Sequence, residues 1–185
     1  MVILIVLGVF AIIAVFASIS IYNNLVRYRV ESENAWSQID VQLKRRYDLI
    51  PNLVESVKGV MNFEKDTLTK VMEARAKAMG APIVSSDRMK AEGEISGCLS
   101  RLLAVWENYP ALKSNQNAMQ LQEELTSTEN RVAYTRSHYN DISANYNALI
   151  QQFPSNVVAG MYGFQKKDYL EVQKNEKVGP QVKLT

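Results

Sequence analysis

The sequence is poor in the side chains that build most reactive sites, since its 185 residues include one cysteine and one histidine. A single cysteine excludes an intrachain disulfide and a zinc site made of several thiolates. A single histidine excludes paired-histidine metal sites, and a Ser-His-Asp arrangement could be built only on His138. We therefore expect His138 on a helix surface and Cys98 as a small packing residue, with a redox or acylation role as the alternative for Cys98.

Glycine and proline are also scarce, with 8 and 5 residues respectively, so the chain should consist of a few long elements. No glycine-rich phosphate-binding loop is present. Gly93 and Gly97 have helical spacing, and Gly160 and Gly163 lie in an apolar stretch without a P-loop lysine.

Neither sign of charge dominates, because 21 lysines and arginines are balanced by 19 aspartates and glutamates, for a net charge of +2. This balance argues against a strong attraction to nucleic acid. Neighbouring carboxylates, such as Glu92 with Glu94 and Glu123 with Glu124, are expected on solvated helix faces. The sequence thus predicts no catalytic, cofactor-binding or metal site, and a protein that is not an enzyme.

One long apolar run extends from Met1 to Ile21 without a charged side chain. About 20 apolar residues suffice for a helix to cross the hydrocarbon core, so we predict a transmembrane anchor over residues 1–22. A cleaved signal peptide is the alternative, because Ser18-Ile19-Ser20 loosely resembles a cleavage site. However, no Lys or Arg precedes the run, and it is longer than the usual signal core of about 7–15 residues.

The basic residues beside this run predict its orientation. Arg27 and Arg29 follow it, and no basic side chain precedes it. Basic residues that flank a span stay in the cytoplasm, and acidic residues nearby have little influence. We therefore expect a single-pass protein with its N-terminus outside and its C-terminal body in the cytoplasm.

A heptad stripe indicates a long helix that ends at Phe153-Pro154. Its members are Ala118, Leu121, Leu125, Thr128, Val132, Thr135, Tyr139, Ile142, Tyr146, Leu149 and Phe153. The positions between them are mostly polar, which is the pattern of a helix packed along one face. Ser114 or Asn115 is the expected start, and the proline ends the helix because the residue before it avoids helical geometry.

A second stripe follows the anchor and contains Pro51. Its members are Trp36, Ile39, Leu43, Arg46, Ile50, Leu53, Val57 and Val60. Proline removes one helical hydrogen bond, so we expect a kink or break at residues 48–51 and leave open whether residues 23–79 form one kinked helix or two. Gly80 ends this pattern, and a further helix is expected from about 88 to 108. The pattern predicts an all-α fold, in which the anchor is followed by a helical bundle over residues 23–154.

Arg46 is a charged side chain that this register places on an apolar face, where an unpaired guanidinium would be costly to bury. We expect a carboxylate to meet it there. The candidate partners are Asp40, Asp48 and Glu129.

Arg45 belongs with Arg46 to the basic cluster Lys44-Arg45-Arg46, for which anionic lipid headgroups are the alternative partner. The cluster begins about 23 residues after the apolar run, roughly 30 Å away along a rigid helix. Screening removes most of the attraction at that distance, so ion pairs are favoured.

Residues 157–164 form an apolar segment with spaced glycines, which precedes a charged tail. We assign residues 155–185 to a separate C-terminal segment. It either folds back to cap the core of the bundle or contacts another protein. The candidates for such a contact are Gly160, Met161, Tyr162, Gly163 and Phe164.

Several blocks of this sequence resemble the LemA family. They include residues 35–54, 109–113, 128–131, 139–140, 146–147, 153–154 and 159–164. One departure is Asn62-Phe63-Glu64, where the family has a histidine before the glutamate. The resemblance implies an N-terminal transmembrane helix followed by a long antiparallel four-helix bundle, in a bacterial single-pass inner-membrane protein with its N-terminus outside and its C-terminus inside. It implies no activity, and the best-known branch of the family concerns magnetosome membranes.

These observations favour a membrane-anchored helical scaffold that self-assembles or recruits partners, with membrane shaping as a mechanical variant. The alternative function is a metal-dependent or enzymatic regulator of the cell envelope. The expected partners are the lipid bilayer, further copies of the chain and other membrane proteins, but not nucleic acid.

Overall fold

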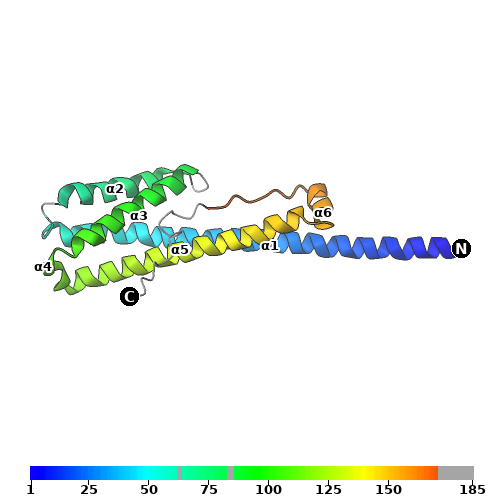
Figure 1. Ribbon diagram of the computed structural model, residues 1–185, viewed down its shortest axis with the longest axis horizontal. Helices are drawn as coiled ribbons and strands as arrows, with labels where there is room; N and C mark the ends of the chain where they lie inside the picture. Colours follow the sequence, from blue (N-terminus) through cyan, green and yellow to red (C-terminus); the bar gives the residue numbers. More distant parts are fainter. Residues whose placement is uncertain (62–63, 83–85, 171–185) are drawn as a thin grey trace, which may run out of the picture. The chain divides into compact units, whose positions relative to one another are not determined.

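The computed structural model describes residues 1–61, 64–82 and 86–170, and this part of the chain is all-α (Figure 1). The helices are α1 (Val2–Lys58), α2 (Lys65–Gly80), α3 (Ser86–Trp106), α4 (Pro110–Lys113), α5 (Gln116–Gln151) and α6 (Ser155–Met161). The all-α class predicted from the sequence is confirmed. The departure at Asn62-Phe63 and the tail 171–185 lie outside the described residues.

Two compact units make up the chain. Unit 1 contains Met1–Gln38 and Thr135–Leu170, and unit 2 contains Ile39–Tyr134. Because α1 and α5 are each continuous, both helices contribute to both units.

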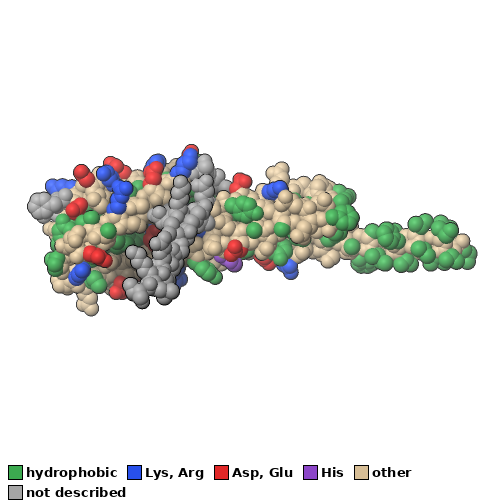
Figure 2. Space-filling model, in the orientation of Figure 1, with side chains coloured by type: hydrophobic (Ala, Val, Ile, Leu, Met, Phe, Trp, Pro, Cys, Tyr) green, Lys and Arg blue, Asp and Glu red, His purple; other side chains and the backbone are tan. Residues whose placement is uncertain are grey.

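The first part of α1, in unit 1, is an exposed apolar helix that is long enough to cross a membrane. None of its most apolar stretch of 18 residues is buried. Phe10, Ile13 and Phe16 are 71%, 60% and 70% exposed, and Figure 2 shows the stretch covered with hydrophobic side chains. Such a surface is unfavourable in water by about 25 cal/mol per Å² and fits the hydrocarbon core of a bilayer.

The rest of unit 1 joins α1, the second half of α5 and α6. Leu25 on α1 and Tyr146 on α5 are buried, and Val158 and Ala159 of α6 pack against them. The C-terminal apolar segment thus folds back onto the core of unit 1, which is one of the two alternatives that the sequence left open.

The core of unit 1 shifts the pKa of the Tyr146 phenol. Burial raises the pKa of its phenol above the ordinary value, because the phenolate would lose its hydration there. Arg29 opposes this rise in the pKa, and Glu33 adds to it. The phenol is thus held in its neutral form within the core.

Unit 2 is a bundle of four helices, formed by the second part of α1, α2, α3 and the first half of α5 (Figure 1). α2 lies against α3, where the ammonium of Lys77 pairs with the carboxylate of Glu94 at 2.7 Å. Arg75 of α2 also donates a hydrogen bond of 2.7 Å to the backbone carbonyl of Tyr47 on α1. α4 is a short connection before α5.

The second predicted stripe is largely a buried face of α1. Its members Ile39, Leu43, Arg46, Ile50, Leu53 and Val57 are at most 2% exposed. Of the kink or break predicted at Pro51, the break does not occur, because α1 continues to Lys58. Proline removes a single amide donor, whereas Ile50 and Leu53 beside it are both fully buried and hold the helix in place. The described part of residues 23–79 therefore contains two helices, because α1 ends at Lys58 and α2 begins at Lys65.

The long predicted helix is α5, with small differences from the expected pattern. The side chain of Asn115 accepts hydrogen bonds from the amides of Asn117 and Ala118 and so caps the start. Phe153 was expected on the buried stripe, but it lies beyond the helix and is 82% exposed. Ser143, and not the bulkier Ile142, is fully buried.

Candidate functional site

A buried charge cluster lies at Arg46 in unit 2. Arg46 comes from α1 and is 0% exposed. Its Nη1 donates to the carboxylate of Glu129 on α5 at 2.9 Å and to the hydroxyl of Ser96 on α3 at 3.0 Å. Its Nη2 donates to the carboxylate of Glu92 on α3. One guanidinium thus links three helices.

The cluster continues from Glu92 through Arg88. Nε of Arg88 lies 3.7 Å from the Glu92 carboxylate, and Nη2 of Arg88 lies 2.9 Å from the carboxylate of Asp40. Positive and negative charges therefore alternate along the series Asp40, Arg88, Glu92, Arg46 and Glu129. This alternation places each guanidinium between two carboxylates.

Glu92 was expected on a solvated face together with Glu94, and this expectation is wrong. Glu92 is 0% exposed, and the phenol of Tyr47 donates a hydrogen bond to it as well. Only Glu94 is exposed. The signal for Glu92 was present in the sequence, because three-four steps back from Trp106 pass through Leu102, Leu99, Ile95, Glu92 and Arg88.

The geometry of this cluster suits a structural role. The side chains of Arg46 and Glu92 are both 0% exposed, so a substrate has no access to the central pair. A shift of α3 against α1 or α5 would leave buried charges without partners, which is strongly unfavourable. We therefore expect the cluster to hold these helices in one register.

The other predicted ion-pair residues lie at the surface. The guanidinium of Arg45 is 3.8 Å from the carboxylate of Glu124, and both side chains are exposed to solvent. Asp48 is not brought to Arg46, and it lines a shallow surface groove with Lys44 and Arg45. Exposed pairs of this kind contribute about 0–1 kcal/mol.

An extended strap, residues 162–170, runs back along α5 in unit 1 (Figure 1). The Asn147 side chain accepts from the amide of Lys167 and donates to the carbonyl of the same residue, both at 2.8 Å. The Asn140 side chain makes the same two bonds with Leu170, again at 2.8 Å. The phenol of Tyr139 donates to the carbonyl of Asp168 at 3.2 Å. Two asparagines seven residues apart thus clamp the strap.

The predicted contact residues lie where α6 turns into this strap. Gly163 has φ +69°, a left-handed conformation that favours glycine, and it allows the chain to turn. Met161 and Tyr162 are 77% and 63% exposed, whereas Phe164 is partly buried against the core of unit 1. Gly160 is also exposed. The segment therefore has one face on the core and another open to its surroundings.

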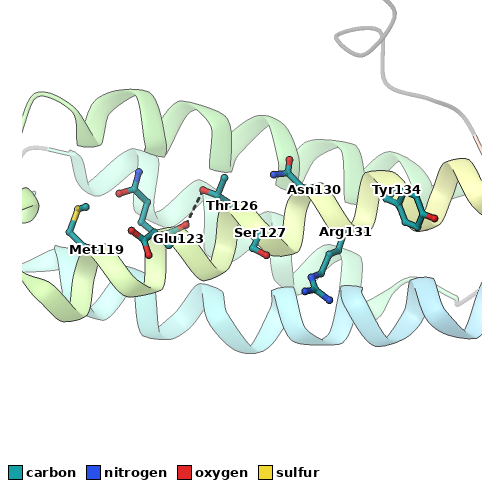
Figure 3. Close-up of a pocket in the computed structure, with 8 residues that line it drawn as sticks. Met119, Glu123, Thr126, Ser127, Asn130, Arg131 and Tyr134 are labelled. Atoms are coloured by element: carbon teal, nitrogen blue, oxygen red, sulfur yellow. Dashed lines mark hydrogen bonds between the residues drawn. The ribbon is translucent and has the colours of Figure 1, made fainter.

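A groove of about 710 Å³ follows one face of α5 in unit 2 (Figure 3). Its lining residues all belong to α5, and they are Met119, Gln122, Glu123, Thr126, Ser127, Asn130, Arg131 and Tyr134. Catalytic pockets usually enclose their ligand between several elements. A face of one helix is better suited to a partner protein than to a small substrate.

The remaining candidates show no assembled chemistry in the described residues. His138 is exposed on α5, and Cys98 is partly buried on α3. Among the residues that the structure describes, no group of three or more His, Cys, Asp or Glu side chains is arranged to hold a metal ion.

This chain is similar to one protein family and to several known proteins. The model of the LemA family matches residues 35–184. The protein LemA of Metamycoplasma hominis is 30% identical over 137 residues, which cover 74% of this chain and 63% of that protein. Magnetosome protein MamQ 2 of Paramagnetospirillum magneticum is 26% identical over 194 residues, which cover 91% of this chain and 71% of that protein.

A further magnetosome protein, MamQ of Magnetospirillum gryphiswaldense, is 25% identical over 173 residues, which cover 80% of this chain and 64% of that protein. The chain thus spans somewhat less than two thirds of the length of the M. hominis and M. gryphiswaldense relatives.

Proposed function

The chain belongs to the LemA family, and from this premise we propose that it is a single-pass, membrane-anchored helical scaffold. The scaffold self-assembles or recruits partner proteins at the cytoplasmic face of a bacterial inner membrane. One observation carries the proposal: α1 is a single helix from Val2 to Lys58. The exposed apolar anchor therefore continues directly into the helix that holds Arg46 in the bundle.

The proposal includes membrane shaping through ordered assembly and assigns no catalytic step. Two of the relatives above are named magnetosome proteins, which supports a role at a membrane. The open groove on α5 supports recruitment, because its polar side chains are bracketed by Met119 and Tyr134. Such a mixed surface is typical of contacts between folded partners.

The first prediction concerns the topology of the anchor. A reporter that is active only in the cytoplasm should be active when fused after Thr185. Arg27 and Arg29 follow the span, and basic residues beside a span keep the adjoining part of the chain in the cytoplasm. The matched measurement uses a reporter active only outside the cytoplasm at the same position. Activity of the second reporter alone would reverse the orientation.

The second prediction concerns assembly. Full-length protein extracted in mild detergent should sediment as a homo-oligomer, whereas a shortened protein that begins at Tyr22 should be mainly monomeric in dilute solution. Confinement to a membrane raises the effective concentration of helical faces that bind weakly in solution. A full-length monomer in several mild detergents would remove self-assembly from the proposal and leave recruitment of unlike partners.

A further inference from the structure

We propose that α6 and its flanking residues form an interfacial platform, which binds the lipid headgroup region of the same bilayer that α1 spans. The α6 platform consists of Phe153, Val157, Met161 and Tyr162. This inference rests on the proposed membrane anchor, and it adds a second, shallow lipid contact to it.

The α6 platform consists of exposed apolar side chains on α6 and on the residues that flank it. Val158 and Ala159 are 5% and 1% exposed because they pack on the core of unit 1. The four platform side chains are between 53% and 82% exposed. Exposed apolar side chains that are grouped in this way are typical of a surface that contacts a membrane or another protein.

The position of α6 along α1 indicates which of these the surface contacts. α6 packs beside Ile21 and Leu25, where the apolar run of α1 ends. Tyr162 lines a groove with residues from within that run, which are Ala14, Val15, Ser18 and Ile19, and with Tyr22. Ala14 to Ser18 lie roughly 5 to 10 Å before Ile21 along a helix that rises about 1.5 Å per residue.

This depth matches the one at which interfacial helices lie. Amphipathic helices bury their apolar face about 5–10 Å into the boundary between headgroups and acyl chains. Tyr162 lines the same groove as Ala14 and Ser18. If α1 crosses the bilayer through its apolar run, Tyr162 therefore lies in that boundary. The platform is therefore continuous with the lipid-facing surface of the anchor.

Aromatic side chains surround this boundary. The ring of Tyr22 lies 4.7 Å from that of Tyr162 and 5.8 Å from that of Phe164, measured between centroids. Tyrosine and other amphipathic rings are enriched where helices leave the hydrocarbon core. The cluster has the composition of an aromatic belt at the level where α1 leaves its apolar run.

Basic side chains lie directly beyond these rings. The guanidinium of Arg29 is 5.3 Å from the centre of the Phe164 ring, and that of Arg27 is 5.4 Å from the centre of the Tyr28 ring. Lys166 follows in the strap and is exposed. Cations at this level can bind the phosphates of anionic lipids. A partner protein would require a separate surface that happens to match both the anchor and this belt, so lipid is the favoured occupant.

The test is the environment of a nitroxide label on full-length protein in nanodiscs of phosphatidylcholine and phosphatidylglycerol. In a Cys98→Ser background, which removes the only native thiol, single labels are attached through Met161→Cys on the platform, Phe10→Cys in the anchor and Asn34→Cys as a control. Asn34 is exposed on α1, roughly 20 Å beyond Ile21. Accessibility to oxygen, which partitions into lipid, is compared with accessibility to a water-soluble nickel chelate.

We expect the ratio of oxygen to nickel accessibility at position 161 to approach that at position 10 and to exceed that at position 34 several-fold. A ratio at 161 equal to that at 34, with position 10 in lipid, would overturn the platform and leave the anchor intact. Shielding of position 161 from both reagents would show a protein contact in its place and would also overturn the platform. A water-accessible label at position 10 would refute the anchor itself, and the platform with it.

Discussion

Glu92→Ala should lower the free energy of unfolding by about 3–5 kcal/mol, because it leaves the guanidinium of Arg46 buried without its main partner. Removing one member of a buried ion pair exposes the full cost of desolvating the other. Glu129 would still accept one bond from Arg46, but the phenol of Tyr47 and Nε of Arg88 would lose their carboxylate too. We expect this to be the largest effect of any single charge removal in unit 2.

Glu94→Ala is the matched control, since Glu94 lies on the same helix and its side chain is 50% exposed in its pair with Lys77. Its loss should change stability by about 0–1 kcal/mol. The measurement is denaturant unfolding of the full-length protein in detergent, followed by far-ultraviolet circular dichroism. Equal midpoints for the two variants would mean that Glu92 is solvated and that the cluster does not hold the bundle.

Arg46→Ala tests the same cluster from the other side. It should destabilise the protein more than Arg29→Ala, by about 1–3 kcal/mol, since Glu92 would then keep only the more distant guanidinium of Arg88. The double variant Glu92→Ala with Arg46→Ala should lose less than the sum of the two single losses, because residues in direct contact are not additive. Strict additivity would indicate that the two side chains do not interact.

The sequence predicts the helices well because a helix with one buried face has apolar residues at a regular three-four spacing. The stripe from Ile39 to Val57 and the stripe along α5 are both of this kind. The need of Arg46 for a carboxylate follows from the same register, but the choice of partner does not. Of the three candidates, Glu129 contacts Arg46, Asp40 binds Arg88 instead, and Asp48 stays at the surface.

Where the sequence prediction failed, a local rule was applied without tertiary context. Glu92 was assigned to solvent from its chemistry, although its register matched that of Leu99 and Trp106. A proline inside a helix permits either a kink or a break, and the helix does not break at Pro51 because the burial of Ile50 and Leu53 outweighs one lost hydrogen bond.

The asparagine clamp, formed by Asn140 and Asn147, could be predicted from the sequence only in part. The repeat of Tyr-Asn at positions 139–140 and 146–147 is visible in the sequence, and its spacing places both asparagines on one face of α5. What they bind could not be inferred, because their partners are backbone groups of the strap and backbone groups have no sequence signature. Only the turn after α6 brings those groups to α5.

Replacement of both clamp residues, by Asn140→Ala with Asn147→Ala, should release the strap from α5 while α5 itself stays helical. Each asparagine holds the amide and the carbonyl of one strap residue. Loss of such paired bonds costs about 1–3 kcal/mol per residue where the backbone groups are left without partners. Asn145→Ala is the control, because Asn145 lies on the exposed side of the same helix.

The direct readout is hydrogen exchange at the amides of Lys167 and Leu170, which donate to Asn147 and Asn140 respectively. Exchange at both amides should accelerate by about tenfold for every 1.4 kcal/mol of lost protection. Asn147→Asp separates the two bonds, since a carboxylate still accepts from the amide of Lys167 but cannot donate to its carbonyl. Exchange at Lys167 in that variant should lie between the rates of the native protein and of Asn147→Ala. If neither amide changes in the double alanine variant, the strap is held by the packing of Leu170 and Phe164, and the asparagines do not position it.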